Sequence, residues 1–318
     1  MGGRNSPLRL RETDRVEIIS IMDNSIDLLL SSQREEVKPL RDWVKKENRH
    51  PIAEHGFSML IRVYDGDESH NILFDTGISP RGVVMNARRM GVNLSDIECI
   101  VLSHGHYDHF TGLPAVVKAI KKSELPIMIH KDMFKKRGVE RANGTIREYP
   151  MFPLEDAVRP AKYIDTKEPH LIANGLVLIT GEIPRVTPFE LGYPQHKAFV
   201  NGKWEPDPWL WDERALVINV RRKGLIILSG CSHAGIINTV LHAQRLTSIE
   251  NIYAILGGLH LSGKNLEGRI TQTVEELKKI RPRIIVPSHC TGWRACYAIY
   301  EAMPDAFVWS SVGNFYIL

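Results

Sequence analysis

The amino-acid sequence predicts an α/β protein built as a four-layer αββα sandwich of two mixed sheets. The first observation behind this prediction is a repeated order of elements, because a β-hairpin followed by βα units occurs once in each half of the chain. Two such halves can bury one face of each sheet against the other and cover the outer faces with helices. The second observation is composition, since 318 residues with 43% hydrophobic and 25% charged side chains are typical of a globular protein with a large core. No stretch has the composition of a linker, so we expect a single domain over residues 1–318.

In the first half, alternating apolar residues indicate strands, and apolar residues spaced by three or four indicate helices. The turn Asp65-Gly66 separates two β-rich runs and predicts a hairpin. Val83, Ala87 and Met90 recur at helical spacing, and Gly91 is expected to end that helix. The elements expected in order are strand 16–22, hairpin strands 57–64 and 71–74, helix 80–90, strand 99–102, helix 113–122 and strand 127–130.

In the second half, the basic turn Arg221-Arg222-Lys223-Gly224 joins two apolar runs and predicts another hairpin. Apolar runs then alternate with amphipathic stretches, which is the pattern of βα units. The elements expected in order are strand 176–179, hairpin strands 215–220 and 225–228, helix 236–246, strand 252–256, helix 268–280, strand 284–286, helix 293–303, and short apolar pieces at 306–309 and 315–318.

Three segments do not fit this order of elements. Residues 26–50 are charged and irregular, which predicts a solvated, partly helical excursion that folds over the site. Residues 131–170 are basic and poorly patterned, so no elements are assigned to them. Residues 188–213 are rich in proline and tryptophan and longer than an ordinary connection, which predicts a lid or a contact between copies of the chain.

Charge, cysteine spacing and hydropathy exclude several classes of protein. The formal net charge of +4 favours an anionic substrate but is too small to argue for nucleic-acid binding. No run of about eighteen apolar residues is present, so we expect no membrane span. Residues 1–15 lack the apolar core of a secretory signal, which predicts a cytoplasmic protein. The four cysteines show no paired spacing, so neither a zinc ribbon nor a disulfide framework is expected.

The stretch Ser103-His104-Gly105-His106-Tyr107-Asp108-His109 places three imidazoles and one carboxylate within six residues. It lies between a buried-strand run and a helix, hence on a loop at the carboxyl end of a strand, where α/β folds carry their chemistry. Residues two apart in an extended segment face the same way, so His104 and His106 are expected to bind one metal ion. The turn into the helix directs Asp108 and His109 to a second ion. The competing interpretation, ordinary surface or core histidines, is disfavoured by this dense spacing.

Three later loops each place a histidine just after an apolar strand, at His233, His260 and His289. Loops at the carboxyl ends of strands meet in one crevice, so we expect these side chains to reach the same site. Two ions need more than four ligands, and we assign His233 and His289 to the metals. His260 is assigned to the substrate or to proton transfer. Each histidine taken alone is also consistent with a helix cap or a hydrogen-bonded imidazole.

Other candidates have weaker patterns. Asp75 follows a strand and is expected to orient a ligand imidazole through its other ring nitrogen, with a turn or helix cap as the alternative. Cys231 either supplies a thiolate, which would favour zinc or iron, or is a small buried hydrophobe. His55 either faces the crevice or lies on the surface. Five further histidines carry no motif and are assigned structural roles: His50, His70, His170, His196 and His242.

The metal loop resembles the motif of the metallo-β-lactamase superfamily. The resemblance implies the αββα architecture and a pair of divalent ions, and it implies that His289 is the last metal ligand. In that superfamily an aspartate after a glycine usually bridges the ions. The corresponding residue here is Cys231, which puts the usual bridging geometry in doubt.

The remaining motifs resemble the branch that contains 7,8-dihydropterin-6-ylmethyl-4-(β-D-ribofuranosyl)aminobenzene 5′-phosphate synthases, over roughly residues 16–318. The resemblance implies condensation of a pterin diphosphate with an aminobenzene ribose phosphate, with release of pyrophosphate, on the route to methanopterin-type cofactors. The motifs that carry it are Glu54-His55-Gly56-Phe57-Ser58, Gly181-Glu182-Ile183-Pro184-Arg185, Gly230-Cys231-Ser232-His233-Ala234-Gly235, Gly257-Gly258-Leu259-His260-Leu261 and His289-Cys290-Thr291-Gly292.

The expected cofactors are two divalent metal ions, zinc before manganese or iron. The expected catalytic residues are Asp108 and His260, and the expected substrate contacts are Glu182, Arg185 and His260. Basic residues between 131 and 141 are candidates for pairing with phosphate, and the tryptophans of 204–211 for stacking on a flat pterin. The alternative function is a dinuclear metallohydrolase acting on a phosphoester or another small anionic ester. A non-catalytic metal-binding protein and an RNA-processing nuclease are further alternatives.

Overall fold

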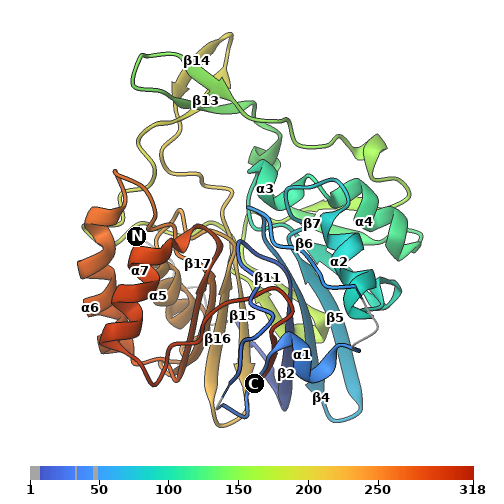
Figure 1. Cartoon of the computed structure of the whole chain (residues 1–318). Coiled ribbons are helices and arrows are strands. Elements are labelled where there is room, and N and C mark those ends of the chain that lie inside the picture. The colour runs from blue at the N-terminus through green and yellow to red at the C-terminus, as the bar shows by residue number, and fades with distance from the viewer. Residues whose placement is uncertain (1–7, 33, 46–48) are drawn as a thin grey trace.

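The alternating apolar runs of the sequence form two large mixed sheets that face each other, with helices on both outer sides (Figure 1). This computed structural model describes residues 8–32, 34–45 and 49–318. Part of the polar N-terminal segment and part of the 26–50 excursion, at residues 1–7, 33 and 46–48, lie outside the described residues. None of the helices in the described ranges is both long and apolar enough to cross a membrane.

The first large sheet has the strand order β10-β7-β6-β5-β4-β2-β19-β3. Its hairpin strands pair antiparallel, whereas β5, β6, β7 and β10 run parallel, as expected for strands joined through helices. The C-terminal strand joins this sheet beside β2. The strands are β2 Arg15–Met22, β3 Val37–Lys38, β4 Ser58–Asp65, β5 Glu68–Phe74, β6 Cys99–Val101, β7 Pro126–Ile129, β10 Lys162–Asp165 and β19 Phe315–Ile317, and the helices of this half are α1 Leu40–Trp43, α2 Gly82–Met90, α3 Tyr107–Phe110 and α4 Leu113–Ile120.

The second large sheet has the strand order β11-β12-β15-β16-β17-β18, and the short strand β1 pairs with β15. The hairpin β15–β16 continues into the parallel strands β17 and β18, so the βα units predicted for this half are present. The elements are β1 Glu12–Thr13, β11 His170–Ile172, β12 Val177–Ile179, β15 Ala215–Val220, β16 Gly224–Ser229, α5 Ile236–Thr247, β17 Ile252–Gly258, α6 Ile270–Ile280, β18 Ile284–Ser288 and α7 Trp293–Ala302.

Three hydrophobic clusters separate the four layers. Successive side chains of a strand point to opposite faces, so Leu216 packs between the sheets while Val217 packs under α5, α6 and α7. Ile72 and Leu73 of β5 divide in the same way between the central cluster and the cluster under α2 and α4. The four-layer αββα arrangement predicted from the sequence is therefore confirmed.

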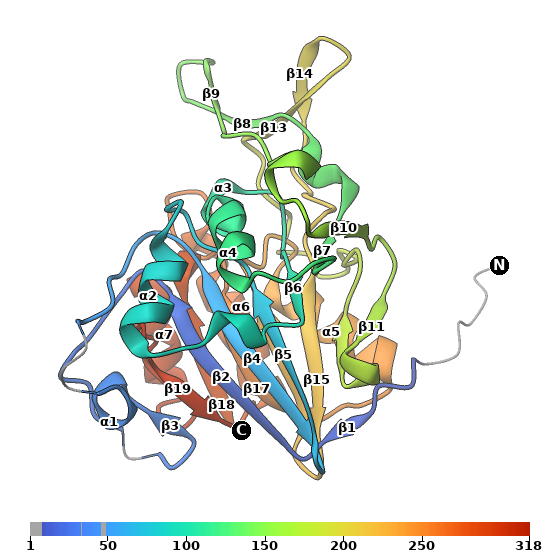
Figure 2. The ribbon, with the colours of Figure 1, turned by 90° about the vertical axis from the view of Figure 1, so that its right-hand side faces the viewer.

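A third, four-stranded sheet with the order β14-β13-β8-β9 was not predicted. It joins the unassigned segment 131–170 to the excursion 188–213, and it projects beyond the two large sheets (Figure 2). The excursion therefore pairs with strand β8 of its own chain. Its predicted role as a lid or as a contact between copies stays a prediction. The strands are β8 Arg137–Glu140, β9 Ile146–Glu148, β13 His196–Val200 and β14 Lys203–Pro206.

Candidate metal centre

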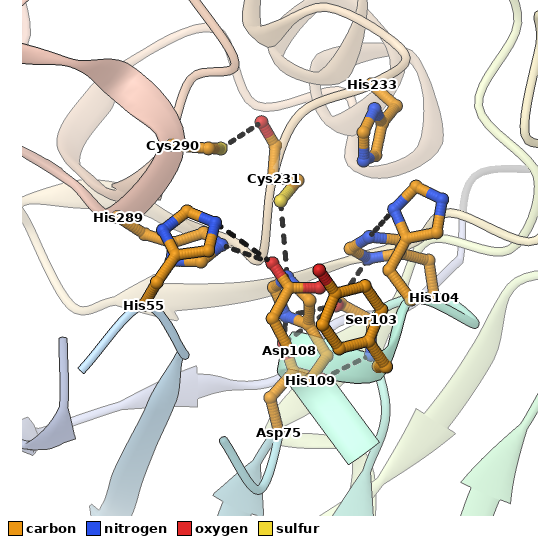
Figure 3. Close-up of polar contacts among 12 residues, drawn as sticks. His55, Asp75, Ser103, His104, Asp108, His109, Cys231, His233, His289 and Cys290 are labelled. Atoms are coloured by element: carbon orange, nitrogen blue, oxygen red, sulfur yellow. Dashed lines mark hydrogen bonds and ion pairs between the residues drawn. The ribbon is translucent and has the colours of Figure 1, made fainter. Parts of the chain in front are cut away.

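The loops that follow β6, β16 and β18 bring His104, His109, His233 and His289 together at the carboxyl ends of these strands (Figure 3). The loop after β6 supplies one side, and its last part is the single turn α3. The loops after β16, β17 and β18 belong to the other half of the chain and supply His233, His260 and His289. The cluster thus contains side chains from both halves of the chain, and their roles as metal ligands remain predictions.

The first group contains His104, His106 and His233, all three of which are buried. Nε2 of His104 lies 3.0 Å from Nδ1 of His106. The ring centroid of His233 lies 4.8 Å from each of the other two rings. Burial, together with neighbouring imidazoles, holds the pKa of all three side chains well below the usual value for histidine, which favours neutral rings with free lone pairs.

Hydrogen bonds fix which nitrogen of each ring is free in this group. Nδ1 of His196 lies 3.0 Å from the carbonyl oxygen of Asp207 and must donate to it, so its Nε2 accepts from Nε2 of His106 at 2.9 Å. His106 then has its lone pair on Nδ1. Nδ1 of His104 lies 2.9 Å from Oγ of Ser103 and donates to that hydroxyl, which leaves the His104 lone pair on Nε2. Two lone pairs therefore face each other, a contact that a shared cation would relieve.

The second group surrounds the carboxylate of Asp108. Its Oδ2 lies 3.3 Å from Nε2 of His289, 3.5 Å from Nε2 of His55 and 3.8 Å from Nε2 of His109. Burial raises the pKa of this carboxyl, but the adjacent His109 and His289 lower the pKa by a larger amount. Asp108 therefore stays ionised. Nδ1 of His289 faces Oδ1 of Asn24 at 3.2 Å, which turns its Nε2 toward the carboxylate. His55 faces the crevice, one of the two placements considered for it.

The hydrogen bond expected of Asp75 is present. Its Oδ2 accepts from Nδ1 of His109 at 2.7 Å, so Nε2 of that ring is free for a metal ion. Its other oxygen accepts the backbone N–H of Ser103 at 2.7 Å, which ties the carboxylate to the metal loop. Gly230 allows the opposite half of the chain to approach this network, because a Cβ there would lie 2.2 Å from Oγ of Ser103.

Cys231 lies between the two groups. Its Sγ is 3.2 Å from Nε2 of His109, and it belongs to donor sets with His104, with His233 and with His289. Cys290 is close by, with its Sγ 3.4 Å from the carbonyl oxygen of Cys231. Burial raises the pKa of the Cys231 thiol well above its usual value, whereas coordination of a metal ion would deprotonate it.

The donor set fits divalent metal ions. Neither ring nitrogen of His233 or His260 has a hydrogen-bond partner within the described part of the chain, and the two ring centroids are 4.0 Å apart. Buried imidazoles without partners are rare because each unpaired group costs free energy. Neutral imidazole, carboxylate and thiolate ligands are those that zinc accepts, and the first two also suit manganese and iron.

Glu182 and Arg185, which were predicted to contact the substrate, have protein partners outside the histidine cluster. Glu182 Oε1 is 3.2 Å from Nε2 of His130 and 3.6 Å from Nζ of Lys167. The guanidinium of Arg185 donates to nearby backbone carbonyl groups and lies over the ring of Trp211, with Cζ 4.7 Å from the ring centroid. These contacts give both side chains structural partners, and their substrate roles remain predictions.

Sequence reasoning missed two parts of the site. His196, which was assigned a structural role, contacts His106 directly and is fully buried. Arg137 and Asp212 form a buried, bidentate ion pair with both N···O distances at 2.7 Å. Asp212 also accepts the backbone N–H of Gly105, so this pair connects the third sheet to the metal loop. Neither feature lies in a local motif, and only pairing between distant segments creates them.

Comparison with known proteins places these observations in context. The sequence model of the metallo-beta-lactamase superfamily matches residues 52–289. A 7,8-dihydropterin-6-methyl-4-(beta-D-ribofuranosyl)-aminobenzene-5'-phosphate synthase of Methanocaldococcus jannaschii is 32% identical over 270 residues, which covers 80% of this chain and 87% of that protein. An uncharacterized protein of the same organism is 32% identical over 267 residues, covering 83% of this chain and 93% of the relative.

Solved structures share the fold. A metal-dependent hydrolase of the beta-lactamase superfamily superposes with a TM-score of 0.70 at 24% identity, covering 95% of this chain and 98% of the other. The metallo-beta-lactamase fold protein YhfI from Bacillus subtilis gives a TM-score of 0.51 at 14% identity, over 96% of this chain and 100% of that protein. Both likenesses concern the fold alone.

Proposed function

This chain belongs to the metallo-beta-lactamase superfamily, and from that membership and the geometry of its site we propose that it is a two-metal synthase. In this proposal it joins a dihydropterin methyl diphosphate to a 4-(β-D-ribofuranosyl)aminobenzene 5′-phosphate and releases pyrophosphate. The small positive net charge agrees with two anionic substrates.

The observation that carries the proposal is the identity with the Methanocaldococcus jannaschii synthase, 32% over 80% of this chain. The match extends over 87% of that protein, so it concerns nearly whole chains rather than the metal loop that the superfamily shares. The donors of the site agree with this proposal, because they form overlapping groups that could hold metal ions, and metal ions can stabilise a diphosphate leaving group.

The histidines that would hold the ions are those whose ring nitrogens have a free lone pair facing the cluster. His104, His106 and His233 would bind one ion. Asp108 and His289 would bind the other, together with His109, whose Nε2 lies 3.8 Å from Oδ2 of Asp108. Cys231 is placed to serve either ion or both. Two divalent ions bound there would act as Lewis acids that stabilise the negative charge of a diphosphate leaving group.

The chain itself must remove a proton. In the proposed reaction the amino nitrogen forms a bond with the pterin methylene carbon, the bond from that carbon to the diphosphate oxygen breaks, and the nitrogen loses one proton. His260 is suited to accept this proton, because both of its ring nitrogens are free of partners in the described chain and it lies next to His233.

Zinc is the metal we propose first.

A dinuclear metallohydrolase is the second candidate. Adjacent metal-ion sites that stabilise the attacking and leaving oxygens also serve phosphoester hydrolysis, so the ligand geometry suits this function too. The difference lies in what attacks: water in a hydrolase, an aromatic amine in the proposed synthase.

The test uses the metal-reconstituted full chain with the two synthase substrates and, separately, a panel of phosphomonoesters and phosphodiesters. We expect release of pyrophosphate only when both synthase substrates are present, and formation of the coupled product by mass spectrometry. His104→Ala should lower this rate by at least roughly a hundredfold because a metal ligand is lost. His70→Ala is the control, since His70 pairs with Glu68 and Glu98 away from the cluster. Ester cleavage without coupling would instead support the hydrolase.

A further inference from the structure

A cavity of about 140 Å³ lies beside the metal centre, at the outer edge of β18. Asp23, Ser288, His289, Trp293 and Trp309 contribute to its lining. One ordered water needs only roughly 10–15 Å³, and pockets for drug-sized ligands start at about 300 Å³. The volume therefore suits a small ring system. Since His289 also belongs to the second metal group, a substituent on such a ring would lie next to the metal centre.

Two tryptophans give this cavity an aromatic wall. The side chain of Trp293 is 70% exposed and that of Trp309 is 41% exposed, although both are large apolar groups. The aromatic neighbour of Trp309 in the described part of the chain is Phe307, at a distance of 6.5 Å between ring centroids. Exposed indoles at the rim of a cavity can gain contact area when a flat ring packs against them.

Polar groups at the inner end of the cavity have unused hydrogen-bonding capacity. Oγ of Ser288 is buried and has no partner in the described part of the chain. Asp23 is 1% exposed, and its carboxylate accepts the backbone N–H of Asn24 at 2.7 Å, that of His289 at 2.8 Å and the hydroxyl of Ser310. A carboxylate has about four acceptor positions, so one remains. The cavity thus offers one strong acceptor and one hydroxyl.

We propose that this cavity is the subsite for the bicyclic ring of the dihydropterin substrate, an inference that rests on the proposed synthase function. A pterin is flat, and its edge carries both N–H donors and acceptors, which match Asp23 and Ser288. The aminobenzene substrate fits less well, because the amine on its ring is the reacting group and its edge offers no further donor or acceptor to Asp23 and Ser288. This assignment differs from stacking on the tryptophans of 204–211, because Trp211 already lies under Arg185.

The experiment measures binding of 6-hydroxymethyl-7,8-dihydropterin, which lacks the diphosphate, to the metal-loaded full chain by titration calorimetry. Trp309→Ala should weaken binding roughly tenfold through lost stacking, and Ser288→Ala roughly fivefold through a lost hydrogen bond. Neither variant should change the metal content. Ser20→Ala is the matched control, because Oγ of Ser20 is also buried and unpartnered in the described chain but lies in β2, outside the cavity lining. This control should bind the probe like the wild type.

Three results would overturn the subsite: no binding of the probe by the wild type, unchanged binding by both cavity variants, or a loss confined to Trp211→Ala. Pyrophosphate release by the wild type, measured in parallel, reports on the function separately. Release with unchanged probe binding in both variants would refute the subsite and leave the synthase standing. If the variants bound the probe more weakly but the wild type released no pyrophosphate, the synthase function would be refuted. The cavity would then still be a pterin-binding site.

Discussion

At the scale of single residues, His196 determines which nitrogen His106 offers to a metal ion. His196 donates from Nδ1 to the carbonyl oxygen of Asp207 and can therefore only accept at Nε2. Because Nε2 of His196 accepts a hydrogen bond, the proton of His106 stays on Nε2 of His106. Nδ1 of His106 is then free and lies beside His104. Without this acceptor, the ring of His106 could take the other tautomer or rotate, and its lone pair would point away from the metal.

His196→Phe is therefore predicted to weaken metal binding roughly 10–100-fold, the usual effect of losing a partner that orients a ligand imidazole. The measurement is competition with a chromogenic chelator at fixed metal. His196→Gln is the matched variant, because the amide oxygen can still accept from Nε2 of His106, and it should recover most of the affinity. Equal affinity in the wild type and in His196→Phe would show that the contact does not position the ligand.

The sequence indicated the histidines that follow apolar strands and missed His196, which lies in no such motif. His104, His106, Asp108 and His109 are dense in sequence, so the spacing alone indicates a metal loop. His196 is a single histidine at the start of the short strand β13, and its contact with His106 spans ninety residues of chain. Such a contact depends on tertiary pairing, for which one sequence contains no local signal.

At the scale of elements, a buried ion pair anchors the third sheet to the metal loop. Arg137 of β8 is 2% exposed, and Asp212, just before β15, is fully buried. Asp212 also accepts the N–H of Gly105 at 2.8 Å. Burial raises the pKa of Asp212, but Arg137 lowers it by more, so the carboxylate stays charged. Removal of Arg137 would leave Asp212 as an uncompensated charge in a low-dielectric environment. Removal of Asp212 would leave Arg137 with only the less buried carboxylate of Asp207, whose Oδ2 lies 3.1 Å from Nε of Arg137.

Asp212→Asn should lower the free energy of unfolding by roughly 3–5 kcal/mol, measured by urea denaturation near neutral pH. The folded-state pKa of Asp212 lies below the unfolded value of about 4, so its stabilisation is complete above that pH and is lost as the pH falls through the folded-state pKa. The variant should therefore also show a flatter loss of stability below pH ~4. Glu124→Gln, which breaks the exposed pair with Lys162, is the control and should leave the free energy of unfolding nearly unchanged. A similar small cost for both variants would contradict the anchoring role.

The large sheets were predictable and the third sheet was not, for one physical reason. Strands such as β15 and β16 bury both faces, so their apolar runs stand out in the sequence. The strands of the third sheet are three to five residues long and only partly buried. Their pairing joins His196 to Val139, far apart in sequence, and the adjacent ion pair supplies stabilisation that hydrophobic periodicity does not report.

At the scale of the whole molecule, the site lies where the two halves meet. The loop after β6 belongs to the first large sheet, whereas His233 and His289 follow strands of the second. An ion bound by ligands from both halves is bound only when the halves are packed together. Metal binding therefore stabilises the folded chain relative to the unfolded chain.

Removal of metal should consequently lower the melting temperature of the wild type. With free metal at about 100 times its dissociation constant, binding contributes roughly 2.7 kcal/mol, which corresponds to roughly 5 °C for a chain of this size. The measurement is calorimetry before and after chelation. His104→Ala and His289→Ala remove one expected ligand from each half, and each should lose much of the chelator-dependent shift even though the two residues follow strands of different sheets. If only one of the two variants lost it, the bound ions would be held by one half of the chain, and the idea that metal joins the two halves would be wrong.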